Sequence, residues 1–151
     1  MSVQQDLASP PGSGDEYRRV FGWPVRLHDN GLELVTGSGI AAVVVPRALS
    51  DRVLAAVARQ GCEGPAVCVP TKRGAVVVLL AEADMLAPSG DALPEGVRVL
   101  TAGTPVRLPS GQGHDLTHWL VAPDPRQRWL PSLNAVLASI RSVAPVRLPQ
   151  P

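Results

Sequence analysis

The chain has few cysteines and few aromatic residues, and both scarcities limit what it can be. Its 151 residues include 2 Cys, 3 Trp, 1 Tyr and 1 Phe. No other metal ligand stands at the usual spacing from Cys62 or Cys68, so we expect two reduced thiols, one in a loop and one in a strand. Because 45% of the residues are hydrophobic and so few are aromatic, the predicted core is aliphatic, built mainly from Val, Leu and Ala.

The chain also lacks an excess of charge of either sign. Its 14 Lys and Arg residues stand against 13 Asp and Glu residues, which gives a formal net charge of +1. This balance excludes the broad basic surface typical of a domain that binds duplex nucleic acid. It leaves room for a local basic face.

The sequence shows no targeting or membrane-spanning segment. The first residues, MSVQQDLASPPGSGDEY, contain no basic stretch followed by an apolar run. No window approaches ~18 uninterrupted apolar residues, the length that a spanning helix needs. We therefore expect a soluble cytoplasmic protein that does not enter a membrane.

A length of 151 residues suits one domain that buries its apolar surface without disulfides. The strand and helix patterns predict the α+β class: a single domain with a mixed or antiparallel sheet of about six to eight short strands and two or three packed helices. We expect this domain over residues 14–143. It lies between a disordered N-terminal tail, 1–13, and a Pro-rich C-terminal tail, 144–151.

Local signals place the expected elements along the chain. Ser13 and Glu16 form a capping-box pattern that starts a short helix through Val20. Amphipathic helices are predicted at 46–60 and 131–143, with Pro131 at the first helical position of the second. Predicted strands span 23–27, 32–36, 40–45, 66–70, 75–80, 97–100, 106–108 and 117–121, and we interpret the last two as the arms of a late hairpin.

The tetrapeptide Pro-Val-Arg-Leu occurs three times, at residues 24–27, 105–108 and 145–148. The intervals are unequal and the flanking residues do not match. We therefore interpret the repetition as chance in a chain rich in these residue types. Addition of the extended C-terminal tail to a sheet edge stays open as an alternative.

His114, Asp115 and His118 lie within five residues and raise the question of a metal or catalytic site. The glycines before them and the β-favouring residues 117–121 argue against a helix that would align the two histidines. We interpret His114 and Asp115 as turn residues and His118 as a strand residue. Cys68 could pair with His114 or His118 as nucleophile and base, but no nucleophile-elbow pattern supports this, so we predict no catalytic residue.

Several short motifs follow one another in a specific order. Glu33–Ile40 stands before an apolar strand and Val69–Gly74 before a second one, and Gly96–Val99, Leu108–Ser110 and His118–Val121 follow. This succession, over roughly residues 20–143, resembles the primase–polymerase family, the archaeo-eukaryotic primase-like domain of actinobacterial type.

The resemblance implies a catalytic site that this chain does not have. The family uses two acids one residue apart, a histidine and a later acid to bind two divalent cations for nucleotidyl transfer. The corresponding positions are Val44 and Pro46, then Ala75 or Val76, and then Arg98. None of these residues binds a metal, so the resemblance implies a noncatalytic pseudoenzyme, with no cofactor and no metal site expected.

Basic and aromatic residues remain as candidates for a binding site. Trp129 and the two arginines before it form the most site-like cluster, because guanidinium and indole groups together can clamp a phosphate and stack a base. A Trp just before an amphipathic helix is more often a core residue, and we favour that interpretation here. The candidate residues for nucleic-acid or phosphate binding are Lys72, Arg73, Arg107, Arg126, Arg128 and Trp129.

Two functional hypotheses follow. The first is a noncatalytic binding or regulatory domain that contacts an unknown protein partner or forms a homo-oligomer. The second is an accessory protein that binds nucleic acid or nucleotide through the Arg and Trp residues. An active nucleotidyltransferase is a distant third, because the metal ligands of the family are missing.

Overall fold

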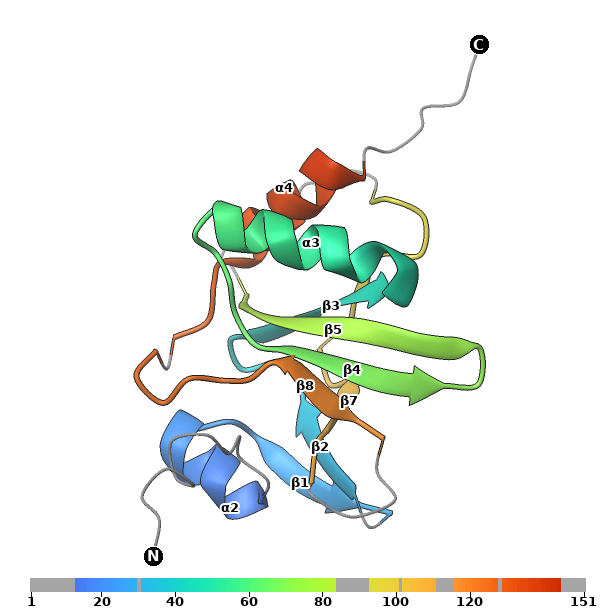
Figure 1. Cartoon of the computed structure of the whole chain (residues 1–151). Helices are drawn as coiled ribbons and strands as arrows, with labels where there is room; N and C mark the ends of the chain where they lie inside the picture. Colours follow the sequence, from blue (N-terminus) through green and yellow to red (C-terminus); the bar gives the residue numbers. More distant parts are fainter. Residues whose placement is uncertain are drawn as a thin grey trace, which may run out of the picture.

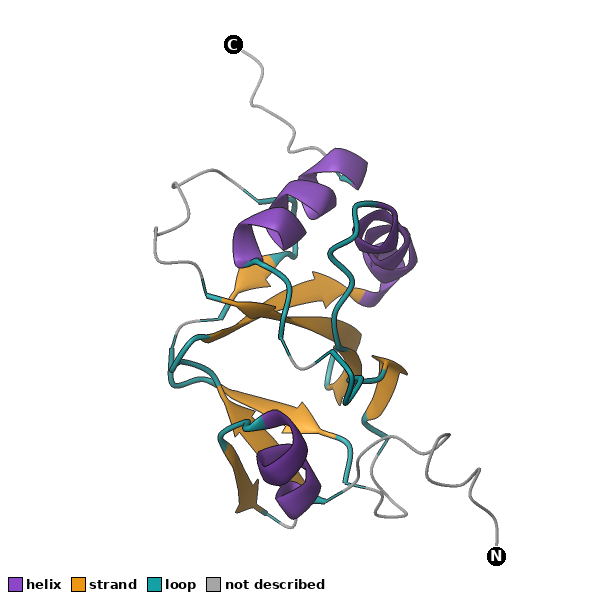
Figure 2. Ribbon diagram, turned by 90° about the vertical axis from the view of Figure 1, so that its left-hand side faces the viewer, coloured by secondary structure: helices purple, strands orange, loops and turns teal. Residues whose placement is uncertain are grey.

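The computed structural model describes residues 13–29, 31–83, 93–100, 102–110, 116–127 and 129–144. These residues form three layers: two helices, a five-stranded sheet, and a three-stranded sheet with a short N-terminal helix beside it (Figures 1 and 2). The predicted α+β class is confirmed. The predicted tails lie outside the described residues except at Ser13 and Ala144, and so do His114, Asp115 and Arg128.

The five-stranded sheet is the centre of the molecule. Its order is β6-β3-β5-β4-β8, and every neighbouring pair is antiparallel. Both faces of its middle strands are buried, which explains the continuous apolar run of β3. The strands are β3 (Ile40–Pro46), β4 (Ala66–Thr71), β5 (Gly74–Glu82), β6 (Arg98–Val99) and β8 (His118–Val121).

Two helices cover one face of this sheet. α3 (Arg47–Arg59) and α4 (Leu133–Val143) lie side by side above β3 and β5 (Figure 2). The core between them and the sheet is aliphatic, as predicted, and includes Val43, Val77 and Ile140, all fully buried. Pro131 precedes α4 and does not begin it, because Ser132 is the N-cap and its hydroxyl accepts a hydrogen bond from the Ala135 N–H.

The other face of the sheet is turned toward the three-stranded sheet, whose order is β1-β2-β7. Its strands are β1 (Val25–His28), β2 (Gly31–Val35) and β7 (Pro105–Leu108). The Pro-Val-Arg-Leu copies at 24–27 and 105–108 flank β2 in the same register: Val25 and Val106 both lie opposite Leu34. The chance interpretation therefore missed a shared structural position of these two copies, while the third copy lies outside the described residues.

Aromatic residues close one end of the space between the two sheets. The Trp23 ring stacks on Tyr17 and Phe21, with centroid distances of 5.7 and 5.0 Å, and lies 6.2 Å from Trp119. The buried Tyr17 hydroxyl donates to the Pro109 carbonyl at 2.9 Å and accepts from Trp119 Nε1 at 3.2 Å. This second core is therefore partly aromatic. The helix α2 (Gly14–Glu16) and the π-helical turn η1 (Tyr17–Phe21) position Tyr17 and Phe21, and the Ser13 cap of α2 is confirmed.

The predicted late hairpin is wrong. β7 pairs with β2 in the three-stranded sheet, whereas β8 pairs with β4 in the five-stranded sheet. β7 and β8 each have a buried or half-buried apolar side, so the pattern of either strand is compatible with more than one partner strand. The local pattern carries no information about which sheet edge is free for pairing. The chain between them crosses from one sheet to the other.

Candidate functional site

An open groove of about 500 Å³ lies between the two sheets, at the end that the aromatic residues do not close. Valines of β3, β4 and β5 form its floor, because every second residue of these strands faces the three-stranded sheet. The connection from β6 to β7 forms one wall, and the β4–β5 turn forms the other. The lining residues are Val44, Val69, Thr71, Lys72, Arg73, Val76, Val78, Arg98, Leu100, Thr104, Pro105, Val106 and Arg107.

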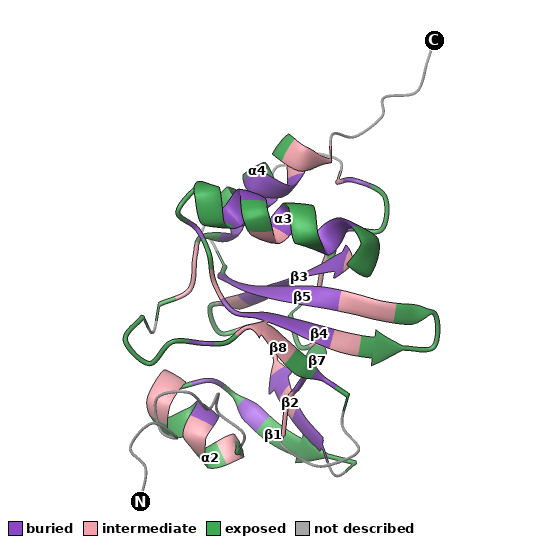
Figure 3. Ribbon diagram, in the orientation of Figure 1, coloured by how far each residue is buried: buried purple, intermediate pink, exposed green. Residues whose placement is uncertain are grey.

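Cations gather around this apolar floor, and none of the described residues that line the groove is acidic. Lys72 and Arg73 stand on the exposed turn between β4 and β5 (Figure 3). Arg98 lies directly opposite Val44 in the β3–β6 ladder, so both side chains are on the groove side of the sheet. In the described part of the chain, none of these three cations forms an ion pair.

Arg107 lines the groove, but its guanidinium points elsewhere. Nη1 lies 3.4 Å from the His28 carbonyl oxygen, to which it donates. The guanidinium occupies the space beside Gly31, where a Cβ atom would overlap it. Arg107 therefore contributes its stem and backbone to the groove wall, and the cations available to a ligand are Lys72, Arg73 and Arg98.

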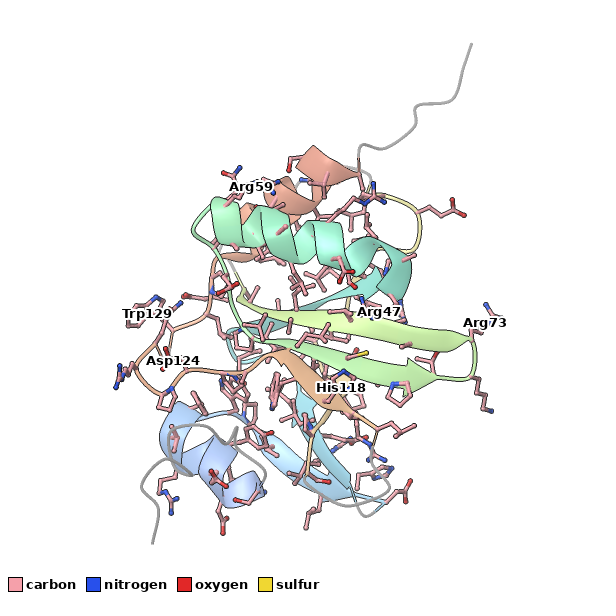
Figure 4. The ribbon with its side chains drawn as sticks, in the orientation of Figure 1. Arg47, Arg59, Arg73, His118, Asp124 and Trp129 are labelled. Carbon is pink, nitrogen blue, oxygen red and sulfur yellow. The ribbon has the colours of Figure 1, made fainter. Side chains whose placement is uncertain are left out.

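The structure divides the predicted binding residues between two places. Lys72, Arg73 and Arg107 line the groove, whereas Arg126 and Trp129 belong to the loop between β8 and α4. Arg73 and Trp129 are at opposite ends of the molecule (Figure 4). The six residues therefore do not form one site, and a clamp that joins Trp129 to the cations of the groove is not possible within one chain.

Trp129 is not a core residue, contrary to the favoured interpretation, because 68% of its surface is exposed. The apolar neighbours Leu130 and Leu133 are the residues that reach the interior: Leu130 packs partly buried against the core between the two sheets, and Leu133, the first residue of α4, is buried in the core between the helices and the sheet. Asp124 shapes the loop by accepting the Arg126 N–H at 2.9 Å, and its carbonyl accepts the Gln127 N–H. This hydrogen-bonded turn precedes Trp129, whose indole lies outside the core.

A second, smaller hollow of about 180 Å³ lies beside the Trp129 indole. Two acidic residues, Glu63 and Asp124, line it together with Gln127, and no basic residue does among those that the structure describes, which do not include Arg128. Neither carboxylate forms an ion pair within the described residues. The other lining residues are Gly64, Pro65, Val121 and Ala122.

Arg98 is not among the candidate binding residues named from the sequence, where it was considered only as a metal-ligand position. Three of the residues considered as metal-ligand positions, Val44, Val76 and Arg98, line the groove together. Pro46 and Ala75 do not line it. The available signal was the alternation along the predicted strands, which puts Val44 and Val76 on one face of the sheet. The partner strand of Arg98 is a tertiary property and could not be found that way.

Cys68 and His118 are cross-strand neighbours on β4 and β8, but no hydrogen bond joins them. His118 Nδ1 lies 3.0 Å from the Leu116 carbonyl oxygen, and the Cys68 thiol is buried. Cys62 and Cys68 are free, in a loop and a strand as expected. Among the described residues, no group of three or more His, Cys, Asp or Glu residues is arranged to hold a metal ion.

Comparisons with models of protein families, with curated proteins and with solved structures gave no match to this chain. Within the described ranges, none of the helices has the length and apolar character needed to cross a membrane.

Proposed function

We propose that the protein is a noncatalytic binding domain whose groove takes an extended, acidic and aliphatic segment of a partner protein. The observation that carries this proposal is the combination of an aliphatic floor with three cations, Lys72, Arg73 and Arg98, that have no ion-pair partner among the described residues. Such a surface is complementary to a peptide in which carboxylates alternate with Val or Leu side chains.

The shape of the groove supports a peptide more than a nucleic acid. Its lining has no aromatic side chain, and proteins that hold single-stranded nucleic acid usually stack the bases on aromatic rings. The valines of the floor instead offer burial to aliphatic side chains, at about 25 cal/mol for each Å² removed from water. The net charge of +1 provides no broad basic surface, which agrees with a ligand that contacts only this local group of cations.

The same residues support a noncatalytic role and a primase–polymerase ancestry. Val44, Val76 and Arg98 line the groove together. The resemblance would place metal ligands at Val44, at Ala75 or Val76, and at Arg98. A guanidinium in place of a carboxylate removes a metal ligand and supplies a fixed positive charge. We propose that the groove is a former nucleotidyl-transfer site that now binds an anionic segment directly.

The test is a fluorescence anisotropy titration with a labelled peptide of alternating Glu and Val residues. We expect binding that weakens with added salt and falls at least tenfold for Arg98→Glu, because a carboxylate would then face the peptide carboxylates. Arg52→Glu is the matched control, since Arg52 is exposed on α3, outside the groove, and its reversal should cost no more than the small loss expected from overall charge. Equal affinities of the two variants would contradict the proposal.

A nucleic-acid ligand is the second candidate, and the unpaired cations favour it. A labelled oligothymidylate at about 50 mM salt tests it, because contacts to phosphates are strongest when ions are scarce. If the wild type bound the oligothymidylate but not the peptide, and Arg98→Glu abolished that binding, the ligand of the groove would be a single-stranded nucleic acid and not a peptide. Incorporation of nucleotides in a primer-extension assay with Mg²⁺ or Mn²⁺ would overturn the noncatalytic role.

A further inference from the structure

The β4–β5 turn is an exposed cationic tip. Thr71, Lys72, Arg73 and Gly74 are all exposed, and Thr71 Oγ1 fixes the turn by accepting the Arg73 N–H and donating to the Gly74 carbonyl. Two neighbouring cations are thus presented on a short, hydrogen-bonded turn at the end of the long hairpin (Figure 1). Among the described residues neither cation has an ion-pair partner.

The hollow beside Trp129 has the complementary character. It offers an exposed indole and two carboxylates, Glu63 and Asp124, to a cation. A Lys or Arg side chain that enters such a hollow gains a cation–π contact with the indole and opposite charges on its sides. The hollow, at about 180 Å³, is small enough that we expect it to take a single side chain.

The tip and the hollow cannot meet within one molecule. Pro65 lines the hollow just before β4, and the tip follows the last residue of β4, Thr71. Six residues of extended strand separate the two sites by about 20 Å. Only a second molecule can bring the cations of the tip to the indole and carboxylates of the hollow.

We propose that the tip of one copy docks into the hollow beside Trp129 of a second copy. The two surfaces are different parts of the chain, so the contact is head-to-tail and each copy keeps one free tip and one free hollow. Repetition then gives an open chain of copies or a closed ring. This inference does not rest on the proposed peptide ligand, although a ligand that engages Lys72 and Arg73 would compete with assembly.

Sedimentation velocity over a series of protein concentrations at low salt tests the proposal. We expect the average mass to rise with concentration and to fall when salt is added, since the contact depends on charge. Trp129→Ala removes the indole from the hollow, and Lys72→Glu with Arg73→Glu reverses the tip. Both changes are on exposed residues, and each variant alone should remain monomeric; Arg52→Glu should assemble as the wild type does.

Mixing the two variants gives the decisive measurement. The Trp129→Ala variant keeps an intact tip, and the reversed-tip variant keeps an intact hollow, so an equimolar mixture should form a heterodimer that grows no further. A mixture that stays monomeric would overturn the head-to-tail contact, as would a wild type whose mass does not depend on concentration. If the wild type bound an Arg-rich peptide but did not self-associate, and Trp129→Ala abolished that binding, the occupant of the hollow would not be a second copy.

Arg98→Glu keeps this test separate from that of the groove. Arg98 lines the groove but neither the tip nor the hollow. The variant should therefore lose peptide binding while it assembles as the wild type does. If Arg98→Glu lost assembly while Trp129→Ala still assembled, the contact between copies would lie in the groove. That result would contradict the inference.

Discussion

The two faces of the five-stranded sheet are built from alternate residues of the same strands, yet they differ in how they are closed. The helix-covered face is sealed: Val43, Val45 and Val77 are fully buried beneath α3 and α4. The opposite face is covered only in part by the three-stranded sheet. Aromatic side chains close one end of it, and the groove occupies the other end.

This difference shows how a small fold separates stability from binding. A helix pair can follow the whole length of a sheet face, whereas a three-stranded sheet at an angle leaves a wedge that only large side chains can fill. Four of the chain's five aromatic residues, Tyr17, Phe21, Trp23 and Trp119, fill one end of the wedge. The end without aromatic residues is the groove.

The largest expected effect comes from removing the centre of the aromatic cluster. Trp23 is 4% exposed and contacts Tyr17, Phe21 and Trp119, so Trp23→Ala should lower the free energy of unfolding by about 3–5 kcal/mol. Trp129→Ala is the matched control, since that indole is exposed and its loss should change stability by no more than about 0.5 kcal/mol. Urea denaturation compares the two variants; equal losses would mean that the aromatic cluster does not hold the sheets together.

A smaller effect separates the two faces directly. Val76 and Val77 are neighbours on β5 that face the groove and the helices respectively, and Val77 is fully buried. Val77→Ala should cost about 2 kcal/mol, because about two methylene equivalents are lost and a cavity remains. Val76→Ala should cost less than about 1 kcal/mol, since the groove is already open. A reversed order of the two denaturation midpoints would show that the helix-covered face is not the stabilising one.

The smallest of the three effects concerns the hydroxyl of Tyr17. Tyr17→Phe keeps the ring stack but removes the donor to the Pro109 carbonyl and the acceptor of Trp119 Nε1. Leaving these partly buried polar groups unpaired should cost about 1–2 kcal/mol. Thermal unfolding measures the loss, and a variant as stable as the wild type would mean that water replaces the hydroxyl.

Much of the secondary structure could be predicted from local pattern. The N-cap at Ser13, the alternation in the paired strands and the amphipathic faces of α3 and α4 all depend on neighbouring residues, and the structure confirms them. The late hairpin failed because β7 and β8 are each compatible with more than one partner strand. The prediction that Trp129 is buried failed because the residue lies in a loop before α4, where helical periodicity does not determine which side chains face the core.

The candidate site was predictable only in pieces. Lys72 and Arg73 could be named from the turn between two predicted strands, and the structure places them at the groove. Arg107 also lines the groove, but its guanidinium lies against Gly31, which depends on the register between β2 and β7. Arg98 became a candidate only when its ladder position opposite Val44 was known.

The sequence by itself determined the α+β class, most of the helices and strands, the aliphatic core under the helices and the absence of acidic residues at positions 44, 46 and 98. These properties follow from residue type and from periods of two and 3.6 residues, which are local. The tertiary structure decided that there are two sheets, that the aromatic residues close only one end between them, and that the cationic tip and the Trp129 hollow lie at opposite ends of β4. Strand pairing is a contact between distant residues, and its outcome depends on which edges the rest of the chain leaves open.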